Sequence, residues 1–175
     1  MRRKKTIAAW RTRVLAAWCF TMVLAAAALS AARAQTPAEW NAMKADINML
    51  MVNDMGRNGY YEQKPIADLM GRMATVLKPK CVLDAGDTHH FNGIASVNDP
   101  LWLTNYEWIY AHPELMIDWF PVMGNHEYRG NTQAVLDYAK VSRRWMMPAR
   151  YYTKVFEKKG TTVRVVFLDT TPLIE

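Results

Sequence analysis

The sequence predicts an α/β fold built from strand–helix–strand (βαβ) units, and three observations lead to this prediction. Short apolar runs at residues 47–52, 80–85 and 119–123 are typical of buried strands. Residues 62–77, between the first two runs, carry apolar side chains at helical spacing. Each run also ends in a short polar segment. Because ligands of open α/β sheets gather at the carboxyl ends of the strands, a functional site is expected there.

The first half of this region forms one predicted βαβ unit. Thr36-Pro37 is a helix-start signal, so a short helix over residues 36–44 should precede the first strand. The helix over 62–77 tolerates Pro65 near its start and ends at Lys78-Pro79. A helix that joins two strands in this way makes a right-handed crossover, and the strands that it joins are parallel.

The second half continues the alternation and then changes character. Residues 98–109 favour a second helical stretch, which leads to the strand over 119–123. A third helix is expected over 132–144. Residues 151–157 and 163–168 are strand-like and flank a Lys-Lys-Gly-Thr turn, a pattern typical of a β-hairpin.

The formal charge of +6 belongs to the first 34 residues. They hold seven basic residues and no acidic one, so the rest of the chain has 15 basic residues against 16 acidic ones. A nearly neutral remainder lacks the basic surface expected of a nucleic-acid-binding protein. No nucleic-acid partner is therefore expected.

The same 34 residues have the layout of a secretory signal peptide. A basic start precedes an apolar stretch over 14–29, and the small-residue ending Ala32-Arg33-Ala34 suggests cleavage before Gln35. We therefore expect export to a periplasm or to the outside of the cell. The apolar stretch is long enough that an uncleaved membrane anchor is the alternative. A stable membrane span is expected only in that case.

Three polar side chains follow the three predicted parallel strands directly: Asp54, Asp87 and Asn125. If the strands are neighbours, these side chains meet at one edge of the sheet. Carboxylate, amide and imidazole ligands together suit transition metals better than calcium or magnesium. Two metals about 3.5–4 Å apart can share a bridging carboxylate. Asp87 is the central candidate for that bridge, with Asp54 on one metal and Asn125 on the other.

Four segments, in this order, resemble the conserved blocks of calcineurin-like metallophosphoesterases, and the resemblance covers roughly residues 47–172. The segments are Asp54-Met55-Gly56, Gly86-Asp87-Thr88-His89-His90, Gly124-Asn125-His126-Glu127 and Leu168-Asp169-Thr170. Within that family they are most similar to the small, tartrate-resistant type of purple acid phosphatase. The resemblance implies a β-sandwich flanked by helices. It also implies hydrolysis of phosphate monoesters by a hydroxide that bridges two metals.

Individual residues take family roles on the same basis. Asp54, Asp87 and Asn125 fall on metal ligands. His126 falls on the catalytic histidine that touches the phosphate or assists the leaving group, and Glu127 falls on the acidic residue that supports it.

The sequence also departs from the family pattern. His90 takes the position of the tyrosine that binds iron(III) in purple enzymes, so we expect His90 to bind a metal of the iron, zinc and manganese class without fixing which. If the loop is extended, His89 points the other way and has a supporting role. Three further family histidines come from a later part of the domain. We therefore expect residues 35–175 to be the N-terminal part of the domain, a truncated half with little activity alone.

Two alternative functions remain open from the sequence. One is a non-catalytic, degenerate phosphoesterase half that acts as a binding module and pairs with another chain. The other stays within the enzyme class, as a phosphodiesterase or nucleotidase, because substrate choice resides in loops. A phosphate ester is the expected substrate in the enzymatic cases, and the sequence sets no oligomeric state.

Overall fold

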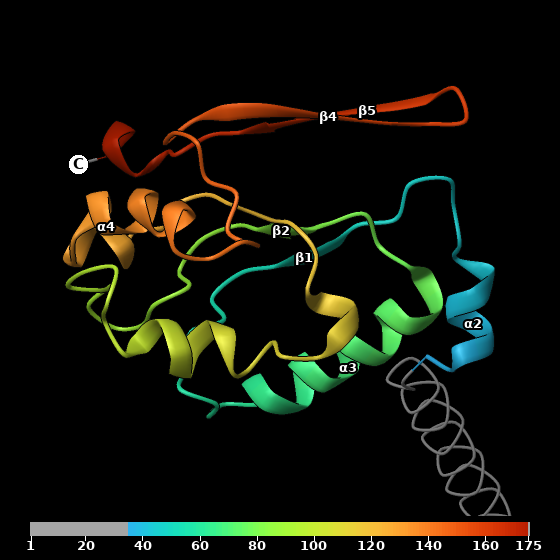
Figure 1. The fold of residues 1–175 in the computed structure, drawn as a ribbon, viewed down its shortest axis with the longest axis horizontal. Helices are drawn as coiled ribbons and strands as arrows, with labels where there is room; N and C mark the ends of the chain where they lie inside the picture. Colours follow the sequence, from blue (N-terminus) through green and yellow to red (C-terminus); the bar gives the residue numbers. More distant parts are fainter. Residues whose placement is uncertain (1–34, 175) are drawn as a thin grey trace, which may run out of the picture. The chain divides into compact units, whose positions relative to one another are not determined.

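Three parallel strands form the central sheet of the protein. In the computed structural model, β1 (Leu50–Val52), β2 (Val82–Asp84) and β3 (Trp119–Pro121) pair in the order β1-β2-β3 (Figure 1). The structure describes residues 35–174, so the predicted signal peptide lies outside them. The three predicted strands are confirmed, although each is shorter than its apolar run. All three end at the same edge of the sheet, as the βαβ prediction requires.

The crossover from β1 to β2 is the helix α3 (Gln63–Leu77), close to its predicted bounds. Its buried residues include Ala67, Met70 and Ala74, spaced three to four residues apart, so one stripe of the helix packs on the sheet. The predicted N-terminal helix is α2 (Pro37–Ala42), which buries Trp40. Within residues 35–174, no helix combines the length and apolar content needed to cross a bilayer.

The connection from β2 to β3 is helical but irregular. A π-helical segment, Trp102–Glu107, lies within the helical stretch predicted over 98–109 but is shorter than that stretch. The helix predicted over 132–144 is also wrong in length: α4 (Thr132–Asp137) continues only as a short 3₁₀ turn, Tyr138–Lys140. The chain leaves the helix because its backbone pairs with β3 instead. The Trp119 N–H donates to Arg144 O at 2.7 Å, and the Met146 N–H donates to Trp119 O at 2.8 Å.

The C-terminal hairpin is confirmed. β4 (Tyr152–Lys158) and β5 (Thr161–Phe167) pair in antiparallel fashion around a two-residue turn. Both turn residues, Lys159 and Gly160, have positive φ values of 49° and 80°, the backbone that tight hairpin turns require.

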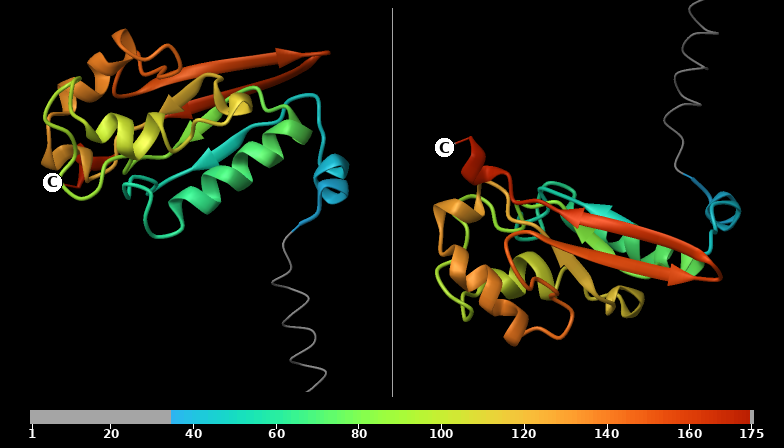
Figure 2. Two further views of the ribbon diagram at one scale, coloured as in Figure 1. Left: turned by 60° about the horizontal axis from the view of Figure 1, so that its bottom comes forward. Right: turned by 90° about the horizontal axis from the view of Figure 1, so that it is seen from above.

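The sheet lies between two apolar layers. The larger cluster fills the space between the sheet and the helices, and includes Trp102, Trp119 and Trp145. A smaller cluster on the opposite face joins Cys81 and Phe120 to the hairpin. Figures 1 and 2 accordingly show the hairpin over the face of the sheet opposite α3. This two-layer arrangement, with helices outside, confirms the predicted metallophosphoesterase-like α/β fold.

Candidate metal centre

The loops that follow β1, β2 and β3 are interlocked through their backbones. Asp54 and Asp87 have left-handed φ values of 53° and 56°. The Asp54 N–H donates to Gly86 O at 3.0 Å, which ties the first loop to the second. Gly86 has φ 103°, and a Cβ there would lie 2.6 Å from Gly124 N, so only glycine allows the second loop to meet the third. The predicted site residues therefore start from a closely packed backbone.

Four of the predicted site side chains converge at this edge of the sheet. His90 Nε2 lies 3.5 Å from Asp54 Oδ1 and 3.9 Å from Asp87 Oδ2. Asp87, His90 and His126 each offer a ligand atom, and these atoms lie within 4.8 Å of one another. One imidazole facing two carboxylates, with a second imidazole beside them, is a donor set that transition metals favour.

The structure places Asn125 in the same loop as His126, but with its side chain exposed. Within residues 35–174, this side chain makes no hydrogen bond. Its ligand role therefore stays a prediction.

His126 is fixed through its backbone and through its ring. Its backbone N–H donates to Asp87 Oδ1 at 2.9 Å, and its Nδ1 lies 2.7 Å from Phe91 O. A carbonyl only accepts, so Nδ1 carries the proton and a neutral ring keeps its lone pair on Nε2. The His126 ring also lies 4.0 Å from the His90 ring, centroid to centroid. Through Nε2, His126 can thus bind a metal as the neutral ring, or donate to a phosphate oxygen once Nε2 is also protonated.

The surroundings of His90 favour the neutral ring, the form that binds metals. Burial lowers the pKa of His90 below its usual value, and the neighbouring His126 and Arg57 act in the same direction, although Asp87 and Asp54 act in the opposite direction. Its Nδ1 is buried without a hydrogen-bond partner in the described part of the chain, while Nε2 faces the two carboxylates. A neutral imidazole between two carboxylates lacks a cation of its own, so the residues present fit a bound metal ion.

The buried Glu127 side chain joins the loop after β2 to the loop after β3. One carboxylate oxygen accepts from the N–H groups of Asp87 at 2.9 Å and Gly124 at 2.8 Å, and the other accepts from His89 at 3.1 Å. The side chain is only 1% exposed. Burial raises its pKa, and the three backbone hydrogen bonds oppose that rise. Glu127 therefore holds Asp87 in place without itself facing the site.

His89 turns away from His90 and into the core. Its ring packs edge-on against Trp102 with centroids 4.3 Å apart, and its Nδ1 lies 3.3 Å from Asn105 Nδ2. Burial lowers the pKa of His89 to about 3, so the ring is neutral. His89 packs beneath the loop and does not join the cluster of Asp87, His90 and His126.

Asp84 supports the same loop from inside β2. Its carboxylate accepts from Thr88 Oγ1 at 2.6 Å and from the Gly86 N–H at 3.1 Å. Burial is the main cause that raises the pKa of Asp84 to about 8. Gly86 and Thr88 flank Asp87, so this buried carboxyl group shapes the turn that carries Asp87.

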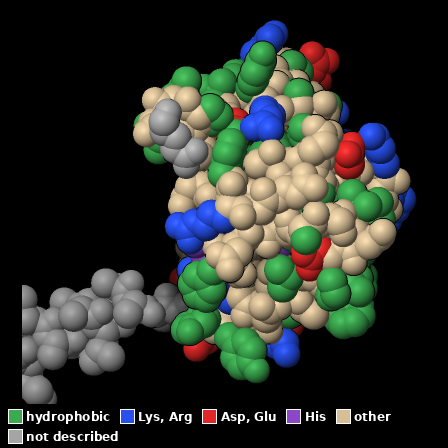
Figure 3. Space-filling model, turned by 90° about the vertical axis from the view of Figure 1, so that its left-hand side faces the viewer, with side chains coloured by type: hydrophobic (Ala, Val, Ile, Leu, Met, Phe, Trp, Pro, Cys, Tyr) green, Lys and Arg blue, Asp and Glu red, His purple; other side chains and the backbone are tan. Residues whose placement is uncertain are grey.

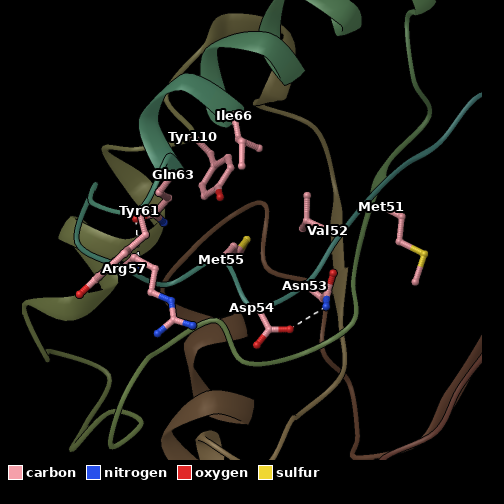
Figure 4. Close-up of a pocket in the computed structure, with 10 residues that line it drawn as sticks. All are labelled: Met51, Val52, Asn53, Asp54, Met55, Arg57, Tyr61, Gln63, Ile66 and Tyr110. Carbon is pink, nitrogen blue, oxygen red and sulfur yellow. Dashed lines mark hydrogen bonds between the residues drawn. The ribbon is translucent and has the colours of Figure 1, made fainter. Parts of the chain in front are cut away.

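A cavity of about 260 Å³ opens beside Asp54 (Figure 4). Residues from the loop after β1 line it, among them Arg57 and Tyr61, together with Gln63 at the start of α3. Sequence reasoning missed Arg57 and its neighbour Phe91. The available signal was a basic residue in a polar loop three positions after a candidate ligand.

The surface toward which the three strands point carries both signs of charge. Acidic and basic side chains are interspersed there with apolar ones (Figure 3). Because positive and negative charges are mixed on this side of the molecule, attraction of an anionic substrate has to come from local groups at the site.

Comparison with known proteins agrees with this geometry. Residues 47–171 match the family described as calcineurin-like phosphoesterase. Purple acid phosphatase 7 of Arabidopsis thaliana is 33% identical over 129 residues, which cover 74% of this chain and 38% of the relative. Tartrate-resistant acid phosphatase type 5 of Homo sapiens is 31% identical over 107 residues, covering 59% and 33%.

A solved structure shows the same fold. The protein described as "GAP50 the anchor in the inner membrane complex of Plasmodium" superposes with a TM-score of 0.61 at 21% identity, over 71% of this chain and 42% of that one. The chain spans 38% and 33% of the length of the two curated relatives named above. The chain belongs to the calcineurin-like phosphoesterase family, and purple acid phosphatases are among its relatives.

Proposed function

We propose that this chain supplies part of the catalytic site of an exported, metal-dependent phosphatase that hydrolyses phosphate monoesters. The convergence of Asp87, His90 and His126 within 4.8 Å is the observation that supports this proposal most strongly. Asp54, 3.5 Å from His90, adds a second carboxylate. Further support comes from two curated relatives that match over this region, because both are named acid phosphatases.

The site would hold two metal ions of the iron, zinc and manganese class. Asp87 would be the shared ligand, because one of its carboxylate oxygens lies within 4.8 Å of ligand atoms of both His90 and His126. Asn125 would complete the second position. Bound metals would supply Lewis acidity and a nucleophile at neutral pH. Their identity depends on His90, because imidazole lacks the strong preference of a phenolate for iron(III).

The chain's own residues would orient the substrate and move a proton. His126, with its Nδ1 proton held by Phe91 O, presents Nε2 to a phosphate oxygen or to the leaving group. Protonated at Nε2, it would donate that proton to the departing alkoxide. Glu127 keeps Asp87 and the loop before His126 in register, so the metal ligand and the proton donor stay aligned.

We infer that residues 35–175 form the N-terminal part of the domain and have little activity alone. The matched part covers only 38% of the relative purple acid phosphatase 7. Among the described residues, one of the two metals would have mainly Asp87 and Asn125 as its ligands. A missing strong ligand weakens metal binding by an estimated few kcal/mol (on the order of a 100-fold loss or more).

We also propose that residues 1–34 are a signal peptide. Secretion of the expressed gene product should give a mature protein that begins at Gln35, which N-terminal sequencing detects. A membrane-bound product that keeps its first 34 residues would support the anchor instead.

Hydrolysis of p-nitrophenyl phosphate and of its bis ester, with iron, zinc or manganese, tests the activity. We expect slow, metal-dependent turnover that favours the monoester, and its loss in Asp87→Asn. Asp68→Asn, an exposed position on α3, is the matched control. A faster rate on the bis ester would favour a phosphodiesterase, and full turnover by Asp87→Asn would contradict the proposed role of Asp87.

A binding module that pairs with another chain is the second candidate. Exposed apolar side chains along β1 and β5, such as Met51 and Val166, favour it. An exposed strand edge is a template for pairing with another strand. Chain association that persists without metal, together with no hydrolysis under any condition above, would support this candidate over the enzyme.

A further inference from the structure

The loop that carries Arg57 is anchored by two buried amides. Gln63 Oε1 accepts from the N–H groups of Arg57 at 3.1 Å and Gly59 at 2.7 Å, and Gln63 Nε2 donates to Asn105 O at 2.8 Å. Asn105 Oδ1 accepts from the Asn58 N–H at 2.6 Å. The backbone on both sides of Arg57 is therefore fixed, and the side chain leaves it from a defined position.

The Arg57 guanidinium is held by two aromatic rings. Its Cζ lies 5.8 Å from the centroid of the Tyr61 ring and 5.2 Å from that of Phe91. Cation–π contacts of this kind hold the guanidinium but use none of its N–H donors. Within residues 35–174, no carboxylate lies in ion-pairing distance of it. Among the residues that the structure describes, Arg57 is thus a positioned cation whose guanidinium donors have no partner.

This cation borders the candidate metal centre. Arg57 and Asp54 line the same cavity (Figure 4). The Phe91 ring lies 5.8 Å from the His90 ring and 6.3 Å from the His126 ring. A phosphate group bound between the two histidines and Asp87 would therefore lie close to Arg57 and to the two rings.

Both rings present apolar area to solvent. The Tyr61 side chain is 79% exposed and that of Phe91 is 60% exposed. We propose that Arg57 binds the substrate's phosphate group, and that Tyr61 and Phe91 select phosphate esters whose leaving group is a flat aromatic ring. This inference rests on the proposed function and adds the substrate class.

The chemistry of each partner supports this assignment. A planar guanidinium offers paired N–H donors that match two oxygens of a phosphate group. Aromatic rings in contact with one another gain affinity beyond the area they bury, about 2- to 10-fold for each pair. An aliphatic leaving group gains nothing comparable from Tyr61 or Phe91.

Calorimetric titration of the chain, with and without Zn²⁺, tests the proposal. The probes are inorganic phosphate, phenyl phosphate, adenosine monophosphate and glycerol phosphate. We expect both aromatic esters to bind more tightly than glycerol phosphate. If adenosine monophosphate binds more tightly than phenyl phosphate, the two rings recognise a nucleobase. If phenyl phosphate binds more tightly, they recognise a simple aryl group. Equal binding of all three esters would overturn the role of the rings.

Variants separate the cation from the rings. Arg57→Gln should weaken binding of inorganic phosphate about tenfold or more, as expected for loss of a charged hydrogen-bond donor. Phe91→Leu should reduce the preference for aromatic esters more than it weakens binding of inorganic phosphate, because the Phe91 ring also contacts the Arg57 guanidinium. Arg72→Gln on the exposed side of α3 and Tyr60→Leu, which lies beside Tyr61 but outside the cavity lining, are the matched controls.

The outcomes distinguish this proposal from the proposed function. Phosphate affinity unchanged in Arg57→Gln, in a chain that binds Zn²⁺ normally, would overturn the role of Arg57 and leave the metal centre standing. A chain that binds no Zn²⁺ would contradict the metal centre, while the Zn²⁺-free titrations would still test Arg57.

Discussion

Glu127 illustrates how one buried carboxylate can fix a site that it does not enter. It accepts three backbone hydrogen bonds, from Asp87, Gly124 and His89. In Glu127→Gln an NH₂ group replaces one of the accepting oxygens and leaves at least one buried N–H unpaired. We expect the free energy of unfolding to fall by about 3 kcal/mol. Denaturant unfolding measures this, and exposed Glu157→Gln should change it by less than about 0.5 kcal/mol.

The buried carboxyl group of Asp84 should make the free energy of unfolding depend on pH. Burial raises its pKa to about 8 in the folded protein, far above that of an unfolded aspartate. Between about pH 4 and pH 8 the unfolded chain loses this proton and the folded chain keeps it. The stability that Asp84 contributes is therefore complete below about pH 4 and declines as the pH rises toward 8.

Asp84→Asn removes that titrating group. The free energy of unfolding of Asp84→Asn relative to the original protein should therefore increase with pH across this range, by at most about 1.4 kcal/mol per pH unit. Urea unfolding of metal-free protein at pH 5 and pH 8 measures the difference. If the two proteins differ in free energy of unfolding by the same amount at pH 5 and pH 8, Asp84 is ionised in the folded state at both pH values.

The sequence predicted which site side chains meet, but not which residues lie beside them. Asp54, Asp87 and His90 could be placed together because parallel strands bring their carboxyl ends to one edge. The contact of Arg57 with Phe91 depends on two loops 34 positions apart in sequence, and no local pattern encodes it. The exposure of Asn125 and the use of Nδ1 by His126 likewise depend on loop geometry.

Among the elements, the hairpin depends on a small aromatic cluster. Phe120 on β3 contacts Phe156 on β4, with centroids 5.6 Å apart, and Phe167 on β5, with centroids 6.1 Å apart. Phe156→Ala should lower the free energy of unfolding by about 3–5 kcal/mol, because it opens a cavity between the two layers.

Thermal or denaturant unfolding checks this value. Val166→Ala on β5 is the control, because its side chain is largely exposed and should cost less than about 1 kcal/mol. An equal loss in both variants would mean that the hairpin is held by its strand pairing alone.

The elements also show why sequence periodicity has limits. The α3 stripe and the hairpin turn were predictable because each is set by residues close in sequence. The segment over 138–147 keeps apolar residues at helical spacing, yet its backbone bonds to Trp119 on β3. Its early exit from α4 follows from a tertiary partner that helix propensity cannot anticipate.

At the scale of the whole molecule, one sheet carries both the core and the site. The helices cover one face, the hairpin covers the other, and the candidate ligands lie at the shared carboxyl edge. Fold class was predictable because three strand runs, a crossover helix and a hairpin all pointed to the same architecture. The activity stays a proposal, because the chain spans only 38% of the length of purple acid phosphatase 7.

Metal binding tests the central claim most directly. Titration of the purified chain with Zn²⁺ or Mn²⁺, followed by calorimetry and metal analysis, should reveal a bound ion whose affinity falls at least about 100-fold in Asp87→Asn, a loss of about 3 kcal/mol. Asp68→Asn should bind as the original chain does. Equal affinity in the Asp87→Asn and original proteins would contradict a metal centre built on Asp87, His90 and His126.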